Sequence, residues 1–130
     1  METQLKMENR INMDKIELLN VIAQAIYDKK GFNILALDVR GVSSICDYII
    51  IAEGNVERHI KAIANEIIEQ LKKLKEKPLH VEGLQDSDWV VVDYLDIIVH
   101  LFKPQLRETY ALEKLWQEGK IIDLKIKVET

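Results

Sequence analysis

The segment DWVVVDYLDIIVHLF, residues 88–102, constrains the fold more than any other part of the chain. Two β-branched runs flank a short polar break, which is typical of two antiparallel strands joined by a tight turn. Side chains alternate between the two faces of a strand. One face therefore holds the core residues Val90, Val92, Tyr94, Ile97, Val99 and Leu101. The opposite, mixed face holds Trp89, Val91, Asp93, Asp96, Ile98, His100 and Phe102.

Two interpretations of the mixed face are open. In the structural one, it is the solvated side of an antiparallel sheet: Asp93 and Asp96 flank the turn, and His100 binds Asp93 or a backbone carbonyl. In the functional one, it is a protein-binding surface, because an exposed tryptophan beside aliphatic and polar groups is typical of an interface hot spot. Exposure of Trp89 distinguishes the two.

The N-terminal part of the chain predicts a tail followed by a helix. Residues 1–13 are polar and lack a periodic pattern, so we expect a flexible tail. Asp14 is an expected N-cap, answered by Glu17 in a capping box. The helix is expected to end at Gly31 in the left-handed conformation. Residues 14–130 then form a single domain.

The remaining pattern predicts a mixed α/β domain. Strands are expected over 33–39 and 47–53, the second in the centre of the sheet, followed by an amphipathic helix over 57–74. A short strand over 79–83, the hairpin over 89–102 and a helix from Pro104 to near Gly119 complete the domain, with a further short strand within 121–128. This order predicts about five strands in a partly parallel sheet backed by helices.

Composition excludes several classes of protein. The 130 residues, 48% of them hydrophobic, suit one soluble domain, and the net charge of −4 argues against direct nucleic-acid readout. The single cysteine, Cys46, excludes an internal disulfide and is interpreted as a small buried hydrophobic residue. The chain lacks a run of the roughly 20 apolar residues that cross a bilayer and has no signal-peptide pattern. We therefore expect a cytoplasmic protein with no membrane partner.

The sequence also predicts a protein that is not an enzyme. Asp93, Asp96 and His100 are residue types found in metal and general-base sites. However, the three histidines, His59, His80 and His100, lie on different elements and lack the spacing of metal ligands. There is no nucleophile elbow, P-loop or dinucleotide fingerprint. We expect no catalytic residue, no metal and no cofactor.

Several linked motifs resemble the ribosomal silencing factor family, also called the Iojap-like proteins. They are ALDV, SSICDYIIIAEGN, RHIKAIANEI, HVEG, DWVVVDYLDIIVHLF and RETYALEKLW, which span Leu19 to Trp116 together with their flanks. The resemblance implies a nucleotidyltransferase-like fold without catalysis. The related fold implies that an active nucleotidyltransferase holds two metal ions with an acidic pair after the glycine turn. The segment after Gly54 has Glu66 but no such pair, which agrees with the absence of catalysis. Two positions depart from the family pattern: Glu53 replaces a small residue, and Leu95 replaces the usual glycine of the turn, so we expect a different turn type.

The resemblance further implies binding to large-subunit ribosomal protein fourteen, which obstructs joining of the small subunit and represses translation. Our hypothesis is that the mixed face makes this contact. The partner-binding residues are predicted to be Trp89, Val91, Ile98 and His100, with Asp86, Asp88, Asp93 and Asp96 meeting basic residues of the partner. The alternatives are a large-subunit assembly factor that uses the same surface, as organelle relatives are, and a residual nucleotide-binding protein. The same surface also suits a symmetric homodimer when the protein is free.

Overall fold

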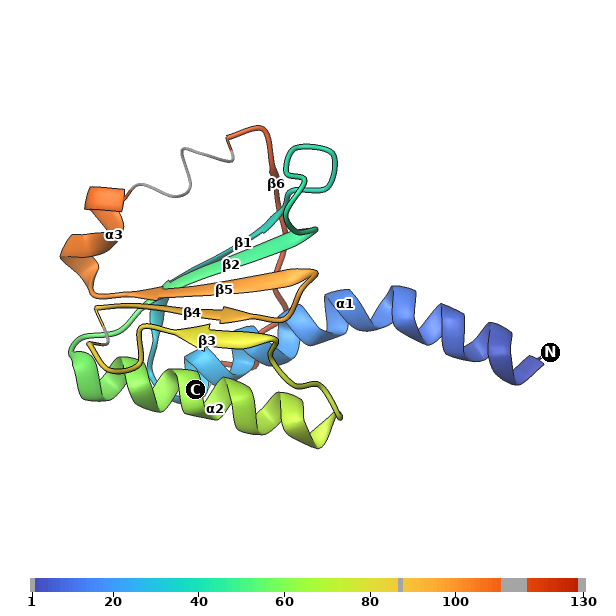
Figure 1. Cartoon of the computed structure of the whole chain (residues 1–130), viewed down its shortest axis with the longest axis horizontal. Helices are drawn as coiled ribbons and strands as arrows, with labels where there is room; N and C mark the ends of the chain where they lie inside the picture. Colours follow the sequence, from blue (N-terminus) through green and yellow to red (C-terminus); the bar gives the residue numbers. More distant parts are fainter. Residues whose placement is uncertain (1, 87, 111–116, 129–130) are drawn as a thin grey trace.

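The computed structural model describes residues 2–86, 88–110 and 117–128 and contains three helices and six strands in this part of the chain (Figure 1). In chain order they are α1 (Glu2–Asp28), β1 (Phe32–Asp38), β2 (Tyr48–Glu53), α2 (Glu57–Lys73), β3 (His80–Glu82), β4 (Trp89–Asp93), β5 (Ile97–Phe102), α3 (Pro104–Tyr110) and β6 (Lys120–Ile121). The predicted order of elements is confirmed. The predicted end of the last helix lies partly outside the described residues.

The strands form one mixed sheet in the order β3-β4-β5-β2-β1-β6. Strand β2 pairs in parallel with β5, while the other neighbours are antiparallel. The predicted central place of β2 is confirmed: all six of its residues are buried. The two-residue strand β6 lies at the start of the segment 121–128, where a further short strand was expected, and it brings the sheet from about five strands to six.

Helices α1 and α2 pack side by side on one face of the sheet (Figure 1). The main core lies between them and the sheet, and its fully buried members include Leu19, Ile22, Ile26, Ile60, Ile63, Ile67, Ile50, Val90, Val92, Val99 and Leu101. Burying one such side chain stabilises the fold by about 1.5–3 kcal/mol. In the part of the chain that the structure describes, no helix is long and apolar enough to cross a membrane.

A second, smaller core lies on the opposite face of the sheet. Its buried members are Leu37, Val39, Cys46, Ile49, Ile51 and Phe102, and Trp89, Ile98 and Leu106 of α3 pack against them. The predicted burial of Cys46 is confirmed, and this burial raises the pKa of its thiol. A thiol that stays protonated is a poor nucleophile.

Both predicted ends of α1 are wrong. The helix begins at Glu2 rather than at Asp14, because the preceding residues are mostly good helix formers without glycine or proline. At the other end Lys30, with φ of 65°, takes the left-handed conformation expected of Gly31. Glycine is required at position 31 for space, because a Cβ there would lie 2.4 Å from Cγ2 of Ile26. The division into a tail of residues 1–13 and a domain of residues 14–130 stays a prediction.

The β4–β5 turn keeps a backbone conformation that suits glycine. Leu95 has φ of 76°, and the amide of Asp96 donates to the carbonyl of Tyr94. These are the marks of a γ-turn with positive φ at its centre, a strained conformation for leucine. Leu95 thus takes the positive φ that the usual glycine adopts easily, and the expected change of turn type stays a prediction. Leu95 is 60% exposed, so little of its side chain is buried in the fold.

Candidate functional site

The β4–β5 hairpin divides its side chains between the two faces largely as predicted. Its register pairs Trp89 with Phe102, Val91 with His100 and Asp93 with Ile98, and this places these six residues on the mixed face. The core set is buried against the helices: Val90, Val92, Val99 and Leu101 are fully buried, Ile97 is 2% exposed and Tyr94 packs at the edge. Strand alternation alone therefore positions the candidate site.

Three aromatic rings form the centre of the mixed face. The Trp89 ring stacks on Phe102 with centroids 5.2 Å apart, and the His100 ring lies 5.9 Å from Trp89. The indole Nε1–H of Trp89 donates to Nδ1 of His100 across 3.1 Å. Packing on two sides and a hydrogen bond therefore fix the orientation of the indole, while the Trp89 side chain stays half-buried.

His100 is a buried neutral histidine. It is only 8% exposed, and this burial lowers its pKa to about 4. Because Nδ1 accepts the indole hydrogen bond, the ring proton of the neutral form is on Nε2. His100 therefore accepts a hydrogen bond from Trp89. The Oδ1 atom of Asp93 accepts a hydrogen bond from the amide of Leu95 across 2.8 Å. His100 therefore fixes the position of Trp89 and exposes little surface to a binding partner.

The four predicted carboxylates do not form one group. Asp86 and Asp88 are exposed, and Asp88 pairs with Lys103 at 2.7 Å. Asp96 is not on the mixed face: its carboxylate points to Lys15 of α1, 3.5 Å away, on the helix side of the sheet. The prediction extended strand alternation into the turn, where the backbone no longer follows it. Lys15 also pairs with Asp47, so that this aspartate ties α1 to the start of β2.

Strand β3 extends the mixed face to the edge of the sheet, which the sequence analysis missed. Its His80 lies opposite Asp93, and its Glu82 lies opposite Val91. Both are exposed, and their side chains pair at 3.0 Å. The sequence pattern that indicates this extension is the alternation of polar His80 and Glu82 around apolar Val81. We define the β3–β5 surface as His80, Glu82, Trp89, Val91, Asp93 and Ile98.

Gly83 allows β3 to lie beside the tryptophan. Its φ is 88°, and a Cβ at this position would lie 2.1 Å from the carbonyl oxygen of Trp89. Any side chain would therefore move the start of β4.

Glu53, the first departure from the family pattern, belongs to a largely buried ion pair. Its carboxylate lies 3.0 Å from Arg107 of α3, and the two side chains are 7% and 12% exposed. Arg107 also donates to the carbonyl of Asn33. The unusual acid at the end of β2 is thus matched by a basic residue on α3, away from the β3–β5 surface.

The nucleotide-binding alternative gains no support from the Gly54–Asn55 turn. The amide of Gly54 donates to the carbonyl of Phe102, and the amide of Asn55 donates to Nδ1 of His59. Both amides are therefore used within the chain. Among residues 2–86, 88–110 and 117–128, no three His, Cys, Asp or Glu side chains gather as a metal site.

Comparison with known proteins identifies the family. The family model described as ribosomal silencing factor during starvation matches residues 12–130. This chain belongs to the ribosomal silencing factor family. A Bacillus subtilis ribosomal silencing factor is 38% identical over 112 residues, which cover 86% of this chain and 95% of that protein. The family resemblance seen in the sequence is thus confirmed, and with it an association with the ribosome.

A solved structure and a mitochondrial protein are also similar to this chain. A crystal structure of a Chromobacterium violaceum protein matches with a TM-score of 0.76 and 32% identity, covering 85% of this chain and 92% of that one. A mouse protein named mitochondrial assembly of ribosomal large subunit protein 1 is 30% identical over 101 residues, 75% of this chain and 44% of that protein. The mixed α/β fold of the ribosomal silencing factors is therefore confirmed.

Proposed function

We propose that this protein binds the large ribosomal subunit through ribosomal protein fourteen of that subunit and blocks joining of the small subunit. The observation that carries the proposal is the state of Trp89, which is half-buried and held by contacts within its own chain. A tryptophan fixed in this way loses little conformational entropy on binding, so more of its contact energy contributes to affinity. Val91 and Ile98, also half-buried, extend the apolar contact.

Charge on and beside the β3–β5 surface supports a basic partner. Glu82 and Asp93 lie on the surface, and Asp86 and Asp88 lie in the loop before β4. Proteins that bind ribosomal RNA carry clustered Lys and Arg, because they neutralise phosphates. Acidic groups around an apolar centre accelerate encounter with such a protein and make binding weaken as salt rises.

The proposed mechanism is steric and needs no chemistry. Once the β3–β5 surface is bound to its partner, the helices and the rest of the sheet occupy space that the small subunit needs at the subunit interface. Repression then depends on position and bound lifetime, not on a catalytic group. We accordingly propose a non-enzymatic protein that acts in the cytoplasm, where it meets free large subunits.

Binding of the isolated ribosomal protein to variants of the β3–β5 surface tests this proposal. Trp89→Ala should weaken binding by about 2–4 kcal/mol if the indole is a hot spot. Val91→Arg should also weaken it, because it places a charged side chain on the apolar part of the same surface. Ile121→Ala is the control, because Ile121 is 76% exposed on the opposite edge of the sheet. If both surface variants, folded as judged by circular dichroism, bind like the control, the contact lies elsewhere.

A second candidate function is assembly of the large subunit, which the name of the mouse relative favours. An assembly factor would use the same surface at an earlier stage. Sedimentation profiles of a deletion strain separate the two roles. Accumulation of immature large subunits supports assembly, whereas mature subunits that join too readily in starved cells support silencing.

The free protein is proposed to pair with itself through the same surface. A symmetric dimer would cover Trp89, Val91 and Ile98 when no ribosome is present. Sedimentation equilibrium should then show a dimer for the wild type and a monomer for Val91→Arg. A wild type that stays monomeric throughout would contradict this.

A further inference from the structure

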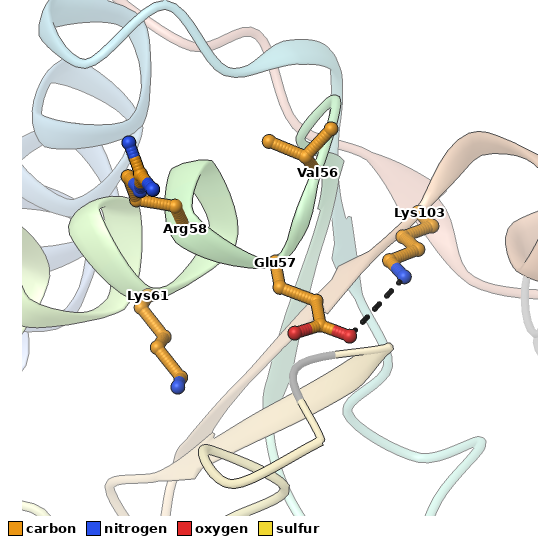
Figure 2. Close-up of a pocket in the computed structure, with 5 residues that line it drawn as sticks. All are labelled: Val56, Glu57, Arg58, Lys61 and Lys103. Carbon is orange, nitrogen blue, oxygen red and sulfur yellow. Dashed lines mark ion pairs between the residues drawn. The ribbon is translucent and has the colours of Figure 1, made fainter.

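The start of α2 carries a group of positive side chains around a shallow hollow (Figure 2). The hollow is lined by Val56, Glu57, Arg58, Lys61 and Lys103, and thus by three cations and one carboxylate. Lys103 comes from the segment after β5, whereas the other four residues lie at or just before the start of α2. The positive charge therefore comes from two elements that the fold brings together, within a chain whose net charge is −4.

The three cations differ in their partners. Lys103 pairs with Asp88 at 2.7 Å and lies 3.7 Å from Glu57, so most of its charge is balanced within the chain. Arg58 and Lys61 are exposed, and neither forms an ion pair with any residue that the structure describes. Two positive charges therefore remain available to an external anion.

The position of Arg58 is unfavourable for the helix itself. It lies in the first turn of α2, at the positive end of the helix dipole, where a cation destabilises and an anion stabilises. The N-cap residue Val56 supplies no side-chain hydrogen bond, so that the first amides of the helix add to the positive potential. Glu57 supplies one negative charge in the same turn, and a further anion beside Arg58 would reduce the remaining unfavourable charge.

The hollow adjoins the β3–β5 surface. The amide of Lys103 donates to the carbonyl of Asp88, and the Lys103 ammonium pairs with the Asp88 carboxylate. Asp88 directly precedes Trp89 in the chain. Helix α2 packs on the sheet face opposite the β3–β5 surface, so the hollow lies at the rim of that surface, at the end of the sheet where β4 begins. A large subunit that is contacted through Trp89 would meet Arg58 and Lys61 around this rim.

We propose that Arg58 and Lys61 bind backbone phosphates of ribosomal RNA beside the docked ribosomal protein. This inference rests on the proposed function, and it specifies a second component of the same binding site. Figure 2 shows Arg58 and Lys61 extending from α2 in different directions, so they do not converge on one point. That spread suits successive phosphates of an RNA strand better than a single phosphate. Such contacts position a protein without reading sequence.

The test compares two charge-matched double variants. Arg58→Gln with Lys61→Gln removes the proposed contact, and Lys72→Gln with Lys73→Gln removes the same charge from the other end of α2, where both lysines are exposed. Affinity is measured for purified large subunits over a range of KCl concentrations, and for the isolated ribosomal protein fourteen. Urea denaturation checks that both variants fold.

The first variant should bind large subunits about tenfold or more weakly at low salt. The slope of log K against log salt should fall by about two, since each phosphate contact contributes close to one. Its affinity for the isolated ribosomal protein should equal that of the wild type. A salt slope and subunit affinity equal to those of the Lys72 and Lys73 variant would overturn the proposal. An equal loss of affinity for the isolated ribosomal protein would also overturn it, because Arg58 and Lys61 would then contact protein and not RNA.

Failure of the proposed function gives a different result. If the wild type does not bind the isolated ribosomal protein, docking through that protein is refuted. A reduced salt slope on whole subunits would then still assign Arg58 and Lys61 to phosphate. An unchanged salt slope would refute both the docking through the ribosomal protein and the phosphate contacts.

Discussion

Acidification should destabilise this fold through His100. Burial lowers the pKa of His100 from 6.5 to about 4, whereas in the unfolded chain the ring titrates near its ordinary value. Between these two values the unfolded state binds a proton that the folded state does not. Stability contributed by the neutral ring is therefore complete above about pH 6.5, falls as the pH drops through this window and levels off below about pH 4. The shift corresponds to a loss of about 3 kcal/mol between about pH 7 and pH 4.

The contribution of His100 is isolated by substitution. In His100→Gln the amide oxygen still accepts the indole hydrogen bond of Trp89, but the side chain no longer titrates. Urea denaturation, followed by circular dichroism over the pH range, should give a much flatter profile for this variant than for the wild type. His80→Gln, at an exposed histidine of the same sheet face, should keep the wild-type profile. Parallel profiles for wild type and His100→Gln would refute this account of the ring.

Three further predictions concern stability and are measured by urea denaturation. Glu53→Ala and Arg107→Ala should each cost about 2–4 kcal/mol, because each removes one partner of a largely buried ion pair. The double variant should cost far less than their sum, and simply additive costs would contradict the pairing. Leu95→Gly should stabilise the fold by about 1 kcal/mol by relieving the positive φ, and a loss of stability would show that the leucine side chain contributes more than the strain. Gly83→Ala should destabilise by more than about 1 kcal/mol and shift tryptophan fluorescence, since its Cβ would overlap the Trp89 carbonyl; unchanged stability would contradict the observed β3–β4 approach.

The parts of the fold that follow from local geometry could be predicted. Alternation along the β4–β5 hairpin placed Val90 and Val92 in the core and Trp89 on the opposite face, because a pleated strand leaves no other arrangement. The continuous apolar run of β2 likewise predicted a strand buried on both faces.

The parts that depend on distant residues could not be predicted. The ion pair of Glu53 joins residues 54 positions apart, and neither residue type indicates the other in the sequence. The partner of His100 depended on the rotamer of Trp89, which packing against Phe102 fixes. Asp96 was misplaced because strand alternation ends at the turn, where the Lys15 side chain is within reach.

The basic hollow at the start of α2 could not be predicted from the sequence either. Arg58 and Lys61 lie on an exposed helix face with alternating charges, which is typical of a solvated surface. Only the fold places Lys103 and the start of β4 beside them.

Joining of purified ribosomal subunits tests the steric mechanism most directly. Large subunits are first saturated with the protein, small subunits are then added, and the fraction of joined ribosomes is measured by light scattering and sedimentation. The wild type should keep most large subunits free, Val91→Arg should allow joining, and Ile121→Ala should act like the wild type. Full joining while the wild-type protein remains bound to the large subunit would contradict the mechanism.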